Sequence, residues 1–301
     1  MKISFLVNHV HNGWGPTDKR LGGTEESVVR WSEELVRRGN QVIVYRNGDK
    51  DGFHNGVLYV DRNRYSGGSD ICINVKSSEV APKEPTLYLT NETDADDKDL
   101  SEYLGVIWPS QWADDNIPVN NQNRFILPHG YDPSKIYPKE KVNKRCLYAS
   151  SPDRGLETLS IIWPSIVAEH PDADLYVTYN GIIDADNVKY GEFSEEEMND
   201  LFNTSDLWIH PCNGGELFGM SAIKAQAAQA IPVYFPTMAL RETVQSGISC
   251  EDGRDMYNSI VQLLGDQAAK DKLREEMKHL KLPTWESTTS RLLEIINSVV
   301  Q

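Results

Sequence analysis

The chain has 301 residues, a length that predicts two domains or one large one. Hydrophobic residues make up 39% and charged residues 25%, an ordinary composition for a chain that buries a core. The 30 basic and 45 acidic residues give a net charge of −15, which argues against nonspecific binding to nucleic acid or to an anionic membrane surface. No apolar run is long enough to predict a membrane span.

The first apolar run, Lys2–Val7, predicts a strand and not a signal peptide, because no long apolar region and no small-residue cleavage site follow it. The four cysteines form no CxxC pair, which is typical of reduced, buried thiols. We therefore expect a cytoplasmic protein.

The periodicity of Thr24–Arg38 predicts a helix with one buried stripe, and Gly39 is expected to end it. Short β-branched and apolar runs predict further strands at Gln41–Tyr45, Val57–Val60, Ile71–Val75, Thr86–Thr90, Val106–Trp108 and Arg124–Leu127. Strands that alternate with helices at these lengths indicate βαβ units and a parallel sheet.

A Pro- and Lys-rich stretch without periodicity, 131–144, predicts the hinge between two domains. We expect an N-terminal domain at 1–138 and a C-terminal domain at 139–301. The last helix is expected at Ser287–Val299, and packing of this helix back on the N-terminal domain is one possible arrangement.

The second half repeats the alternation, and Ser194 with Glu197 forms the sequence pattern of a capping box. Strands are expected at Cys146–Ala149, Asp174–Thr178, Asp206–His210 and Pro232–Phe235. Helices are expected at Gly155–His170, Ser194–Asn203, Ser221–Ala230, Arg254–Leu264 and Ala268–Leu280. The fold class is α/β, with two doubly wound Rossmann-like domains whose parallel sheets face each other across a cleft.

Three strand-end loops carry residues suited to binding. The loop 8–23 ends in Gly22-Gly23 at a helix start, which suits a diphosphate or sugar but equally a plain connection. In Ser150–Leu156, Arg154 suits a phosphate, and a solvated arginine is the alternative. The strongest signal is 206–233, where Glu216 lies in a Gly-rich turn beside a helix start that can bind an anion.

In these segments the chain resembles the GT-B glycosyltransferases of family 4, and the resemblance covers most of the chain. The motifs that carry it are Gly22-Gly23-Thr24-Glu25, Pro128-His129-Gly130-Tyr131-Asp132, Ser150–Leu156 and Glu216–Val233, in the family's order.

The resemblance implies a retaining, metal-independent hexosyltransferase that takes a nucleotide sugar, with UDP- or GDP-sugars favoured and no other cofactor. The C-terminal domain would bind the donor, and the N-terminal domain a glycan or small hydroxylated acceptor. Catalytic candidates are Arg154, Glu216, Glu92 and Asp94. Donor-binding candidates are Gly22, Gly23, Ser151, Arg154, Tyr190, Gly191, Glu216, Leu217, Phe218, Gly219, Met220, Ser221 and Lys224. Candidates for the acceptor or the cleft are His11, Trp14, Asn91 and His210.

The chain departs from the family at three places. Lys224 stands where a second glutamate usually accepts hydrogen bonds from the ribose, and a lysine has only donors. Gln229 replaces a glycine. The segment 90–94 lacks the family's His-Asp pair, so Glu92 and Asp94 either take over that role or are solvated loop acids.

Other signals have simpler readings. Three Asp-Ala-Asp spacings, at 94–96, 172–174 and 184–186, are expected to be surface loops and not metal sites. Trp31, Trp163 and Trp208 are expected in the core, whereas Trp14, between two glycines, is a candidate for stacking on a sugar.

Two other functions stay open. One is a noncatalytic binder of nucleotides or sugars on the same scaffold, which Lys224 favours. The other is a glycosyltransferase acting on modified DNA bases; the net charge argues against it. That function would need a basic edge formed by Arg37, Arg38, Lys139, Lys141, Lys144 and Arg145.

Overall fold

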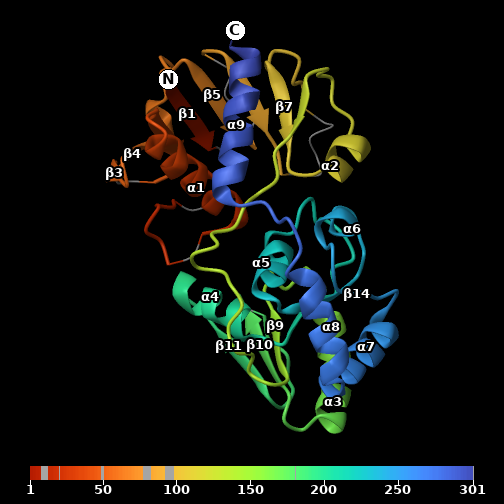
Figure 1. The fold of residues 1–301 in the computed structure, drawn as a ribbon. Coiled ribbons are helices and arrows are strands. Elements are labelled where there is room, and N and C mark those ends of the chain that lie inside the picture. Colours follow the sequence, from red (N-terminus) through yellow and green to blue (C-terminus); the bar gives the residue numbers. More distant parts are fainter. Residues whose placement is uncertain are drawn as a thin grey trace. The chain divides into compact units, whose positions relative to one another are not determined.

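The computed structural model describes residues 1–7, 13–19, 21–48, 51–76, 83–91, 98–179 and 181–300. These residues form two compact units (Figure 1). Unit 1 comprises 1–130 and 283–301, and unit 2 comprises 131–282. The segment 131–138, expected in the N-terminal domain, belongs to unit 2, because Ile136 is buried in a core of unit 2 and the Tyr137 N–H donates to Asn203 Oδ1 at 2.9 Å.

Unit 1 is built on an eight-stranded sheet with the order β3-β4-β2-β1-β5-β6-β7-β8. Its strands are β1 (Lys2–Val7), β2 (Gln41–Arg46), β3 (Gly52–His54), β4 (Val57–Asp61), β5 (Ile71–Val75), β6 (Thr86–Leu89), β7 (Gly105–Trp108) and β8 (Arg124–Ile126). Every neighbouring pair is parallel except the edge pair β3 and β4. A parallel sheet needs crossover connections, and these put helices over its faces.

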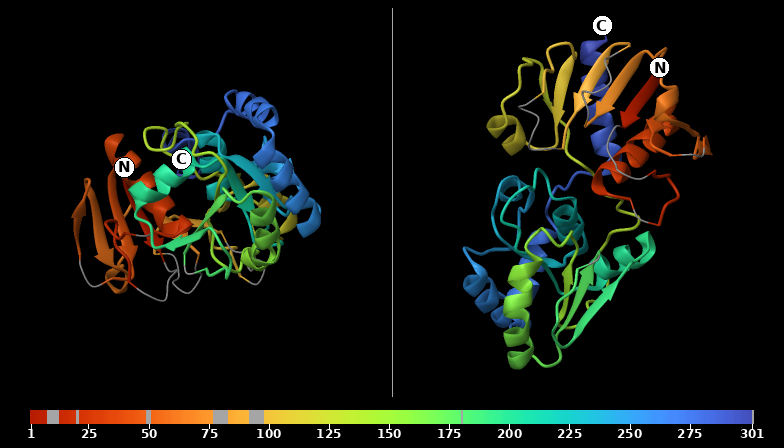
Figure 2. Two further views of the ribbon diagram at one scale, coloured as in Figure 1. Left: turned by 90° about the horizontal axis from the view of Figure 1, so that it is seen from below. Right: turned by 180° about the vertical axis from the view of Figure 1, so that it is seen from behind.

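Helix α1 (Gly23–Arg37) packs on this sheet beside the last helix, α9 (Trp285–Val299), as Figures 1 and 2 show. The buried Trp31 of α1 donates from Nε1 to Thr288 Oγ1 at 3.0 Å and meets the Trp285 ring edge-on, with ring centroids 5.9 Å apart. The chain therefore returns to unit 1 at its C-terminal end. Unit 1 also contains the short helices η1 (Arg62–Arg64) and α2 (Gln111–Asn116).

Unit 2 is built on a six-stranded parallel sheet with the order β11-β10-β9-β12-β13-β14. Its strands are β9 (Arg145–Tyr148), β10 (Asp174–Thr178), β11 (Val188–Gly191), β12 (Leu207–His210), β13 (Ile231–Tyr234) and β14 (Ile248–Ser249). Counted from β9, this is the order 3-2-1-4-5-6 of the Rossmann fold. The strand order reverses between β9 and β12, which are neighbours in the sheet.

Helices cover both faces of the unit 2 sheet. The strand side chains alternate between two cores, so that Tyr148 and Ile209 lie in one core while Leu147 and Trp208 lie in the other. The helices of unit 2 are α3 (Leu156–Glu169), α4 (Glu195–Thr204), α5 (Met220–Ala228), α6 (Leu240–Thr243), α7 (Gly253–Gly265) and α8 (Gln267–Met277). Within the described ranges, no helix is long and apolar enough to cross a membrane.

The long elements and the short edge strand β8 match their sequence patterns, whereas the edge strands β3, β11 and β14 were not expected. The capping box of Ser194 and Glu197 is present, and Gly39 follows α1 with a φ of +83°. Trp31, Trp163 and Trp208 are fully buried, as expected. Tyr190 and Gly191, named from sequence as donor-binding candidates, end strand β11, in which Tyr190 pairs with Val177 of β10.

The start of strand β12 is held by a buried ion pair. Asp206 and Lys270 are each about 2% exposed, and Lys270 Nζ donates to Asp206 Oδ2 at 2.8 Å. Arg274 binds the other carboxylate oxygen, and the Lys144 N–H donates to Oδ2 at 2.8 Å. Although burial favours the neutral acid, Lys270, Lys144 and Arg274 hold the pKa of Asp206 below its ordinary value.

We expect Asp206→Asn to destabilise unit 2 by about 3–5 kcal/mol, because it leaves Lys270 buried without a counter-charge. Urea denaturation followed by tryptophan fluorescence measures this loss. Asp271→Asn is the matched control, since Asp271 is 65% exposed and lies 3.8 Å from the same Arg274. A loss below about 1 kcal/mol for Asp206→Asn would contradict a structural role for the pair.

Candidate functional site

The candidate site lies at the carboxyl ends of β9 and β12, where the strand order of unit 2 reverses. Parallel α/β sheets bind ligands at such a point, because the two connecting chains leave toward opposite faces and open a crevice. The loop after β9 carries Arg154, and the loop after β12 carries Glu216. Both loops end at the start of a helix, α3 and α5 respectively.

Arg154 is held by the backbone around it. Its own N–H donates to the Ser151 carbonyl at 3.0 Å, and the Tyr148 hydroxyl donates to the same carbonyl at 2.6 Å. Its guanidinium donates from Nη1 to the Gly214 carbonyl at 2.9 Å, and 27% of the side chain is exposed. The arginine is thus oriented by the Gly214 carbonyl and by Asp153, whose Oδ2 lies 3.5 Å from its Nε, and its partly exposed guanidinium can bind a ligand anion.

A glycine joins the two loops. Gly155 has a φ of +89°, which few L-residues adopt, and it precedes the first residue of α3. A Cβ added at Gly155 would overlap the Pro211 carbonyl, so the loop after β9 approaches the loop after β12 backbone to backbone. Gly215 similarly leaves room for the Arg154 guanidinium, since a Cβ there would overlap Nη1.

Glu216 and His210 form a partly buried pair at the end of β12. His210 is fully buried and stacks on Trp208, with ring centroids 4.8 Å apart. Its Nε2 lies 3.7 Å from Glu216 Oε2, and the Glu216 side chain is 20% exposed. Within the described part of the chain, neither ring nitrogen has a partner at hydrogen-bond distance. The glutamate therefore has a buried face toward His210 and an open face toward solvent.

The two groups shift each other's protonation. Burial opposes a charge on His210, but the neighbouring Cys212 thiol and Glu216 carboxylate outweigh it and raise the imidazole pKa. Burial favours neutral Glu216, but His210, Arg154 and the Gly219 N–H outweigh it and lower the carboxyl pKa. Protonated His210 therefore stabilises the fold, and this effect is lost as the pH rises through its raised pKa. Ionised Glu216 also stabilises the fold, and this effect is lost as the pH falls through its lowered pKa. Between these two pKa values both groups are charged.

Helix α5 places its first N–H groups beside Glu216. Gly219 precedes the helix with a φ of +85°, and the first intrahelical bonds run from Ala222 and Ile223 back to the Gly219 carbonyl. The N–H groups of Met220 and Ser221 thus face away from the helix body, with the positive end of its dipole behind them. The first turn contains no acidic side chain. An anion at this edge would meet Arg154 and a helix start together.

Sequence reasoning missed the loop after β13. The Thr237 hydroxyl donates to the Cys212 carbonyl at 2.8 Å, the Ala239 N–H donates to the Glu216 carbonyl at 3.2 Å, and the Gly215 N–H lies 2.9 Å from Met238 Sδ. These contacts fix the path of 212–216. The sequence indicates the loop after β13 only by its position behind a buried strand, because the contacts of this loop run mainly to backbone atoms.

Most of the donor-side residues named from sequence lie at this edge, and two need comment. Ser151 and Leu217–Ser221 are in the two loops and the first turn of α5. Tyr190 lies on the edge strand β11, where its hydroxyl hydrogen-bonds to the Ile183 backbone. This hydroxyl therefore has a partner within unit 2. Lys224 lies on α5, one turn into the helix.

The residues named in unit 1 are placed as follows. Gly22 is the N-cap of α1, and the Glu25 carboxylate folds back so closely that a Cβ at Gly22 would overlap it. Asn91 Nδ2 lies 3.5 Å from Thr24 Oγ1. Trp14 is only 6% exposed. His11, Glu92 and Asp94 lie outside the described residues.

No cluster of three or more potential metal ligands occurs among the described residues. Of the Asp-Ala-Asp spacings, 94–96 lies outside the described residues. Asp172 and Asp174 pair instead with lysines, at 2.7 Å to Lys144 and 2.8 Å to Lys189. The charges that the site does offer are the Arg154 guanidinium and the Glu216 carboxylate. This combination can bind an anion and accept hydrogen bonds from hydroxyl groups.

We expect Glu216→Gln to lower the pKa of His210, because the neutral amide removes a stabilising charge while the imidazole stays buried. Titration of ¹³C-labelled histidine by NMR measures this directly. The exposed His279 provides the internal control, and its signals should be the same in both proteins. An unchanged His210 pKa in the variant would mean that Glu216 is not coupled to it.

Comparison with known proteins supports the fold strongly and the sequence relationship weakly. No protein-family model matches the chain. A stretch of 81 residues, 26% of the chain, is 32% identical to a phosphatidyl-myo-inositol mannosyltransferase of Propionibacterium freudenreichii subsp. shermanii. That match spans only 21% of the relative's length.

Solved structures match nearly the whole chain. A glycosyltransferase from Rickettsia africae has a TM-score of 0.77 at 12% identity, covering 100% of this chain and 98% of that one. Sucrose-phosphate synthase from Thermosynechococcus elongatus has a TM-score of 0.74 at 14% identity, with coverages of 99% and 98%. Anabaena HepE in complex with UDP and glucose has a TM-score of 0.74 at 14% identity, with coverages of 99% and 100%. The chain therefore has the fold of the GT-B glycosyltransferases.

Proposed function

We propose that the protein is a glycosyltransferase that binds a nucleotide sugar at the carboxyl edge of the unit 2 sheet. The proposal rests on one juxtaposition: Arg154, Glu216 and the start of α5 lie together where the strand order reverses. A nucleotide sugar has a diphosphate next to a polyhydroxy ring, which matches a cation and helix start next to a carboxylate. A similar fold solved with UDP and glucose is consistent with this assignment.

In the proposed reaction, the bond between the anomeric carbon and the diphosphate breaks, and an acceptor hydroxyl oxygen bonds to that carbon on the same face while its proton passes to the departing diphosphate oxygen. Negative charge grows on the leaving diphosphate, and Arg154 with the α5 N–H groups would stabilise it without a metal ion. Glu216 would accept hydrogen bonds from the donor sugar, and His210 would keep it ionised.

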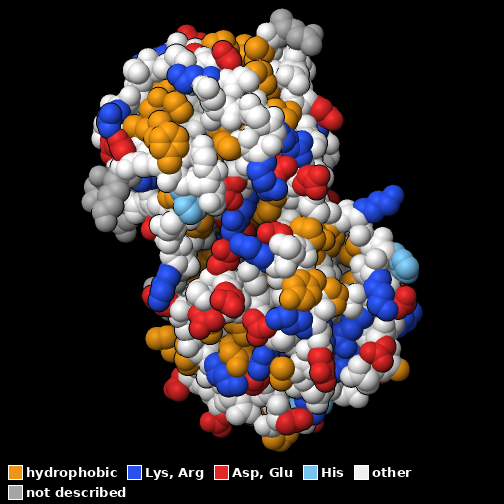
Figure 3. All heavy atoms as spheres, turned by 60° about the vertical axis from the view of Figure 1, so that its left-hand side comes forward, with side chains coloured by type: hydrophobic (Ala, Val, Ile, Leu, Met, Phe, Trp, Pro, Cys, Tyr) orange, Lys and Arg blue, Asp and Glu red, His pale blue; other side chains and the backbone are white. Residues whose placement is uncertain are grey.

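A nucleic-acid acceptor is disfavoured because the basic residues that could form an edge are engaged within the protein. Their ion-pair or hydrogen-bond partners are Glu34 for Arg37 and Arg38, Asp200 for Lys139, backbone carbonyls for Lys141, Asp172 for Lys144 and Asp174 for Arg145. On the face in Figure 3, acidic and basic side chains are interspersed. We propose a glycan or a small hydroxylated molecule as the acceptor.

Arg154 is expected to contribute to nucleotide binding. We expect Arg154→Ala to weaken the binding of UDP or GDP at least tenfold, because a charge-assisted bond to the diphosphate is lost. Isothermal titration calorimetry without added metal measures this, and Arg254→Ala, at an exposed arginine of α7, is the matched control. Equal affinities for the wild type and Arg154→Ala would remove Arg154 from the site.

Glu216 is expected to contribute to the turnover of a nucleotide sugar. The substrate is the nucleotide sugar that carries the nucleotide found to bind. We expect its hydrolysis or transfer to persist in EDTA. We expect Glu216→Gln to reduce this activity about 100-fold or more. The NMR coupling constant of the anomeric proton in the product should match that of the donor. An inverted product would contradict the retaining step, and loss of activity in EDTA would contradict metal independence.

The noncatalytic alternative is favoured by Lys224, which cannot accept a hydrogen bond from a ribose. The Lys224→Glu variant separates the two functions. If the wild type binds nucleotides and turns over no nucleotide sugar, while Lys224→Glu binds more tightly and is active, the protein is a binder. Turnover by the wild type excludes that alternative.

A further inference from the structure

Helix α1 begins with two glycines, and a buried serine one turn later holds their backbone. Gly22 is the N-cap and has no side chain that could bind the free N–H groups of the first turn. Ser27 is about 1% exposed, and its hydroxyl donates to the Gly23 carbonyl at 2.6 Å. The start of the helix is therefore tied to one buried hydroxyl group.

The Ser27 hydroxyl is itself held by His129, which is 4% exposed and whose Nδ1 lies 2.7 Å from Ser27 Oγ. A carbonyl oxygen can only accept, so the one hydroxyl proton of Ser27 is directed at Gly23. The proton between Ser27 Oγ and Nδ1 must then belong to the imidazole. His129 is therefore the donor in this bond, with Nδ1 protonated.

The imidazole ring of His129 is fixed by its surroundings in unit 1. It stacks on the Trp31 ring, with centroids 5.6 Å apart and planes 20° from parallel, and Trp31 meets the Trp285 ring edge-on. A Cβ added at the following residue, Gly130, would lie 2.5 Å from the Trp285 nitrogen. The segment 128–130 thus packs between α1 and the start of α9, which leaves the imidazole little freedom to move.

The start of α1 follows the strand of unit 1 at which the strand order reverses. Strand β1 pairs with β2 on one side and with β5 on the other, and the chain runs from β1 through 8–22 into α1. Parallel α/β sheets bind ligands at such a point. Gly22 and Gly23 are the donor-binding candidates of unit 1, so the group that fixes their backbone affects how they meet a donor.

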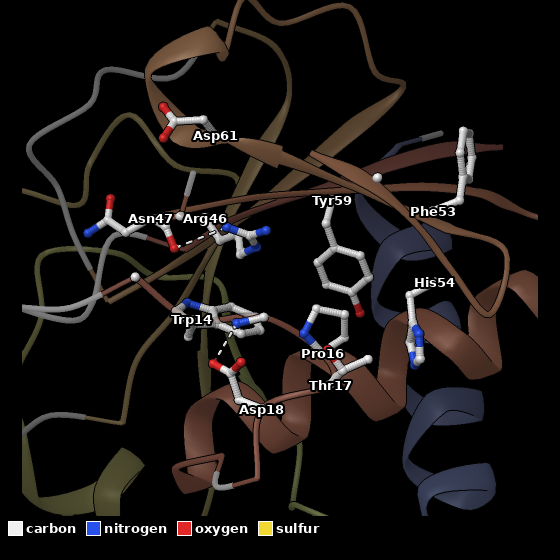
Figure 4. Close-up of a pocket in the computed structure, with 14 residues that line it drawn as sticks. Trp14, Pro16, Thr17, Asp18, Arg46, Asn47, Phe53, His54, Tyr59 and Asp61 are labelled. Atoms are coloured by element: carbon white, nitrogen blue, oxygen red, sulfur yellow. Dashed lines mark hydrogen bonds between the residues drawn. The ribbon is translucent and has the colours of Figure 1, made fainter. Parts of the chain in front are cut away.

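The loop before α1 is held by different contacts (Figure 4). The Trp14 N–H donates to the Asn47 carbonyl at 3.0 Å, which ties this loop to the end of β2. The loop lines a pocket of about 870 Å³, whose wall residues do not include Ser27 or His129 within the described ranges. His129 therefore acts on the helix and not on the loop.

We propose that His129 is a positioning residue for the start of α1. It donates from Nδ1 to Ser27 Oγ, and the serine hydroxyl is thereby directed at the Gly23 carbonyl. With this carbonyl fixed, the first N–H groups of the helix keep one direction. A contact between these N–H groups and a nucleotide sugar rests on the proposed function, whereas the positioning itself does not.

NMR of the full-length protein with ¹⁵N-labelled histidine tests the direction of the proton, and His129→Asn assigns the signals of His129. At about pH 8, where an ordinary imidazole is neutral, we expect Nδ1 of His129 to carry a proton. His170 is the internal control with the opposite tautomer, because its Nε2 lies 2.9 Å from the Val261 carbonyl, which can only accept. An unprotonated Nδ1 at His129 overturns the proposal.

Three variants test the positioning. His129→Phe keeps a ring beside Trp31 and removes the donor, whereas His129→Asn keeps a donor at nearly the same place, because Asn Nδ2 and His Nδ1 are both bonded to Cγ. We expect His129→Phe and Ser27→Ala to shift the amide NMR signals of Gly22 and Gly23. We expect the same signals in His129→Asn to stay close to those of the wild type.

Ser298→Ala is the matched control, because it removes an exposed hydroxyl of α9 that donates to the Ile295 carbonyl at 2.7 Å. It should leave the Gly22 and Gly23 signals unchanged. Unchanged signals in His129→Phe, or equal shifts in His129→Phe and His129→Asn, overturn the proposal. If His129→Phe does not fold, Ser27→Ala and the wild-type tautomer decide the question.

Kinetics distinguish a failure of this proposal from a failure of the proposed function. With a nucleotide sugar that the wild type turns over, we expect kcat/KM to fall about tenfold in His129→Phe and in Ser27→Ala. It should fall no further in the double variant and should recover in His129→Asn. Equal kcat/KM in the wild type and His129→Phe overturns the positioning role. If the wild type turns over no nucleotide sugar, the proposed function fails, while the NMR signals still decide the role of His129.

Discussion

The contact between Gly155 and the Pro211 carbonyl is the constraint on which the candidate site depends. Only a residue without a Cβ fits there, and its φ of +89° turns the chain from the loop after β9 into helix α3. Because the two loops touch at this point, Arg154 reaches the Gly214 carbonyl across the place where the strand order reverses. The sheet topology brings the two loops together, and Gly155 sets how closely their backbones approach.

The chemical character of this edge comes from the charges of Glu216, His210 and Arg154. Glu216 lies next to a fully buried imidazole and near Arg154, so that burial, which favours neutral groups, is outweighed by mutual charge stabilisation. The carboxylate stays ionised and directed, and the start of α5 adds partial positive charge without a titratable group. One edge of the sheet therefore presents groups that can bind an anion, Arg154 and the start of α5, beside Glu216, which can accept hydrogen bonds from hydroxyl groups.

Much of this arrangement is predictable from sequence, for a physical reason. Long elements bury a periodic face, so patterns such as Thr24–Arg38 locate helices to within a residue or two. Arg154 and Glu216 follow buried strands, and parallel strands bring such ends to one edge. Short edge elements such as β3 and β11 bury little and have no comparable signal.

The sequence does not predict contacts that depend on the path of a loop. The support that Thr237 gives to Cys212 uses a backbone carbonyl, which has no sequence signature. Trp14 is likewise buried by its loop, in which its N–H donates to the Asn47 carbonyl at 3.0 Å. Its position between two glycines makes Trp14 a candidate for stacking on a sugar in the sequence, yet its side chain is only 6% exposed.

The central claim is that the carboxyl edge of unit 2 binds a nucleoside diphosphate. Amide chemical-shift mapping with UDP and GDP tests it most directly, since each backbone N–H reports its own surroundings. We expect the largest shifts in 151–156 and 214–221, the two loops and the first turn of α5. Shifts that are absent there, or that cluster at another edge of either unit, would contradict it.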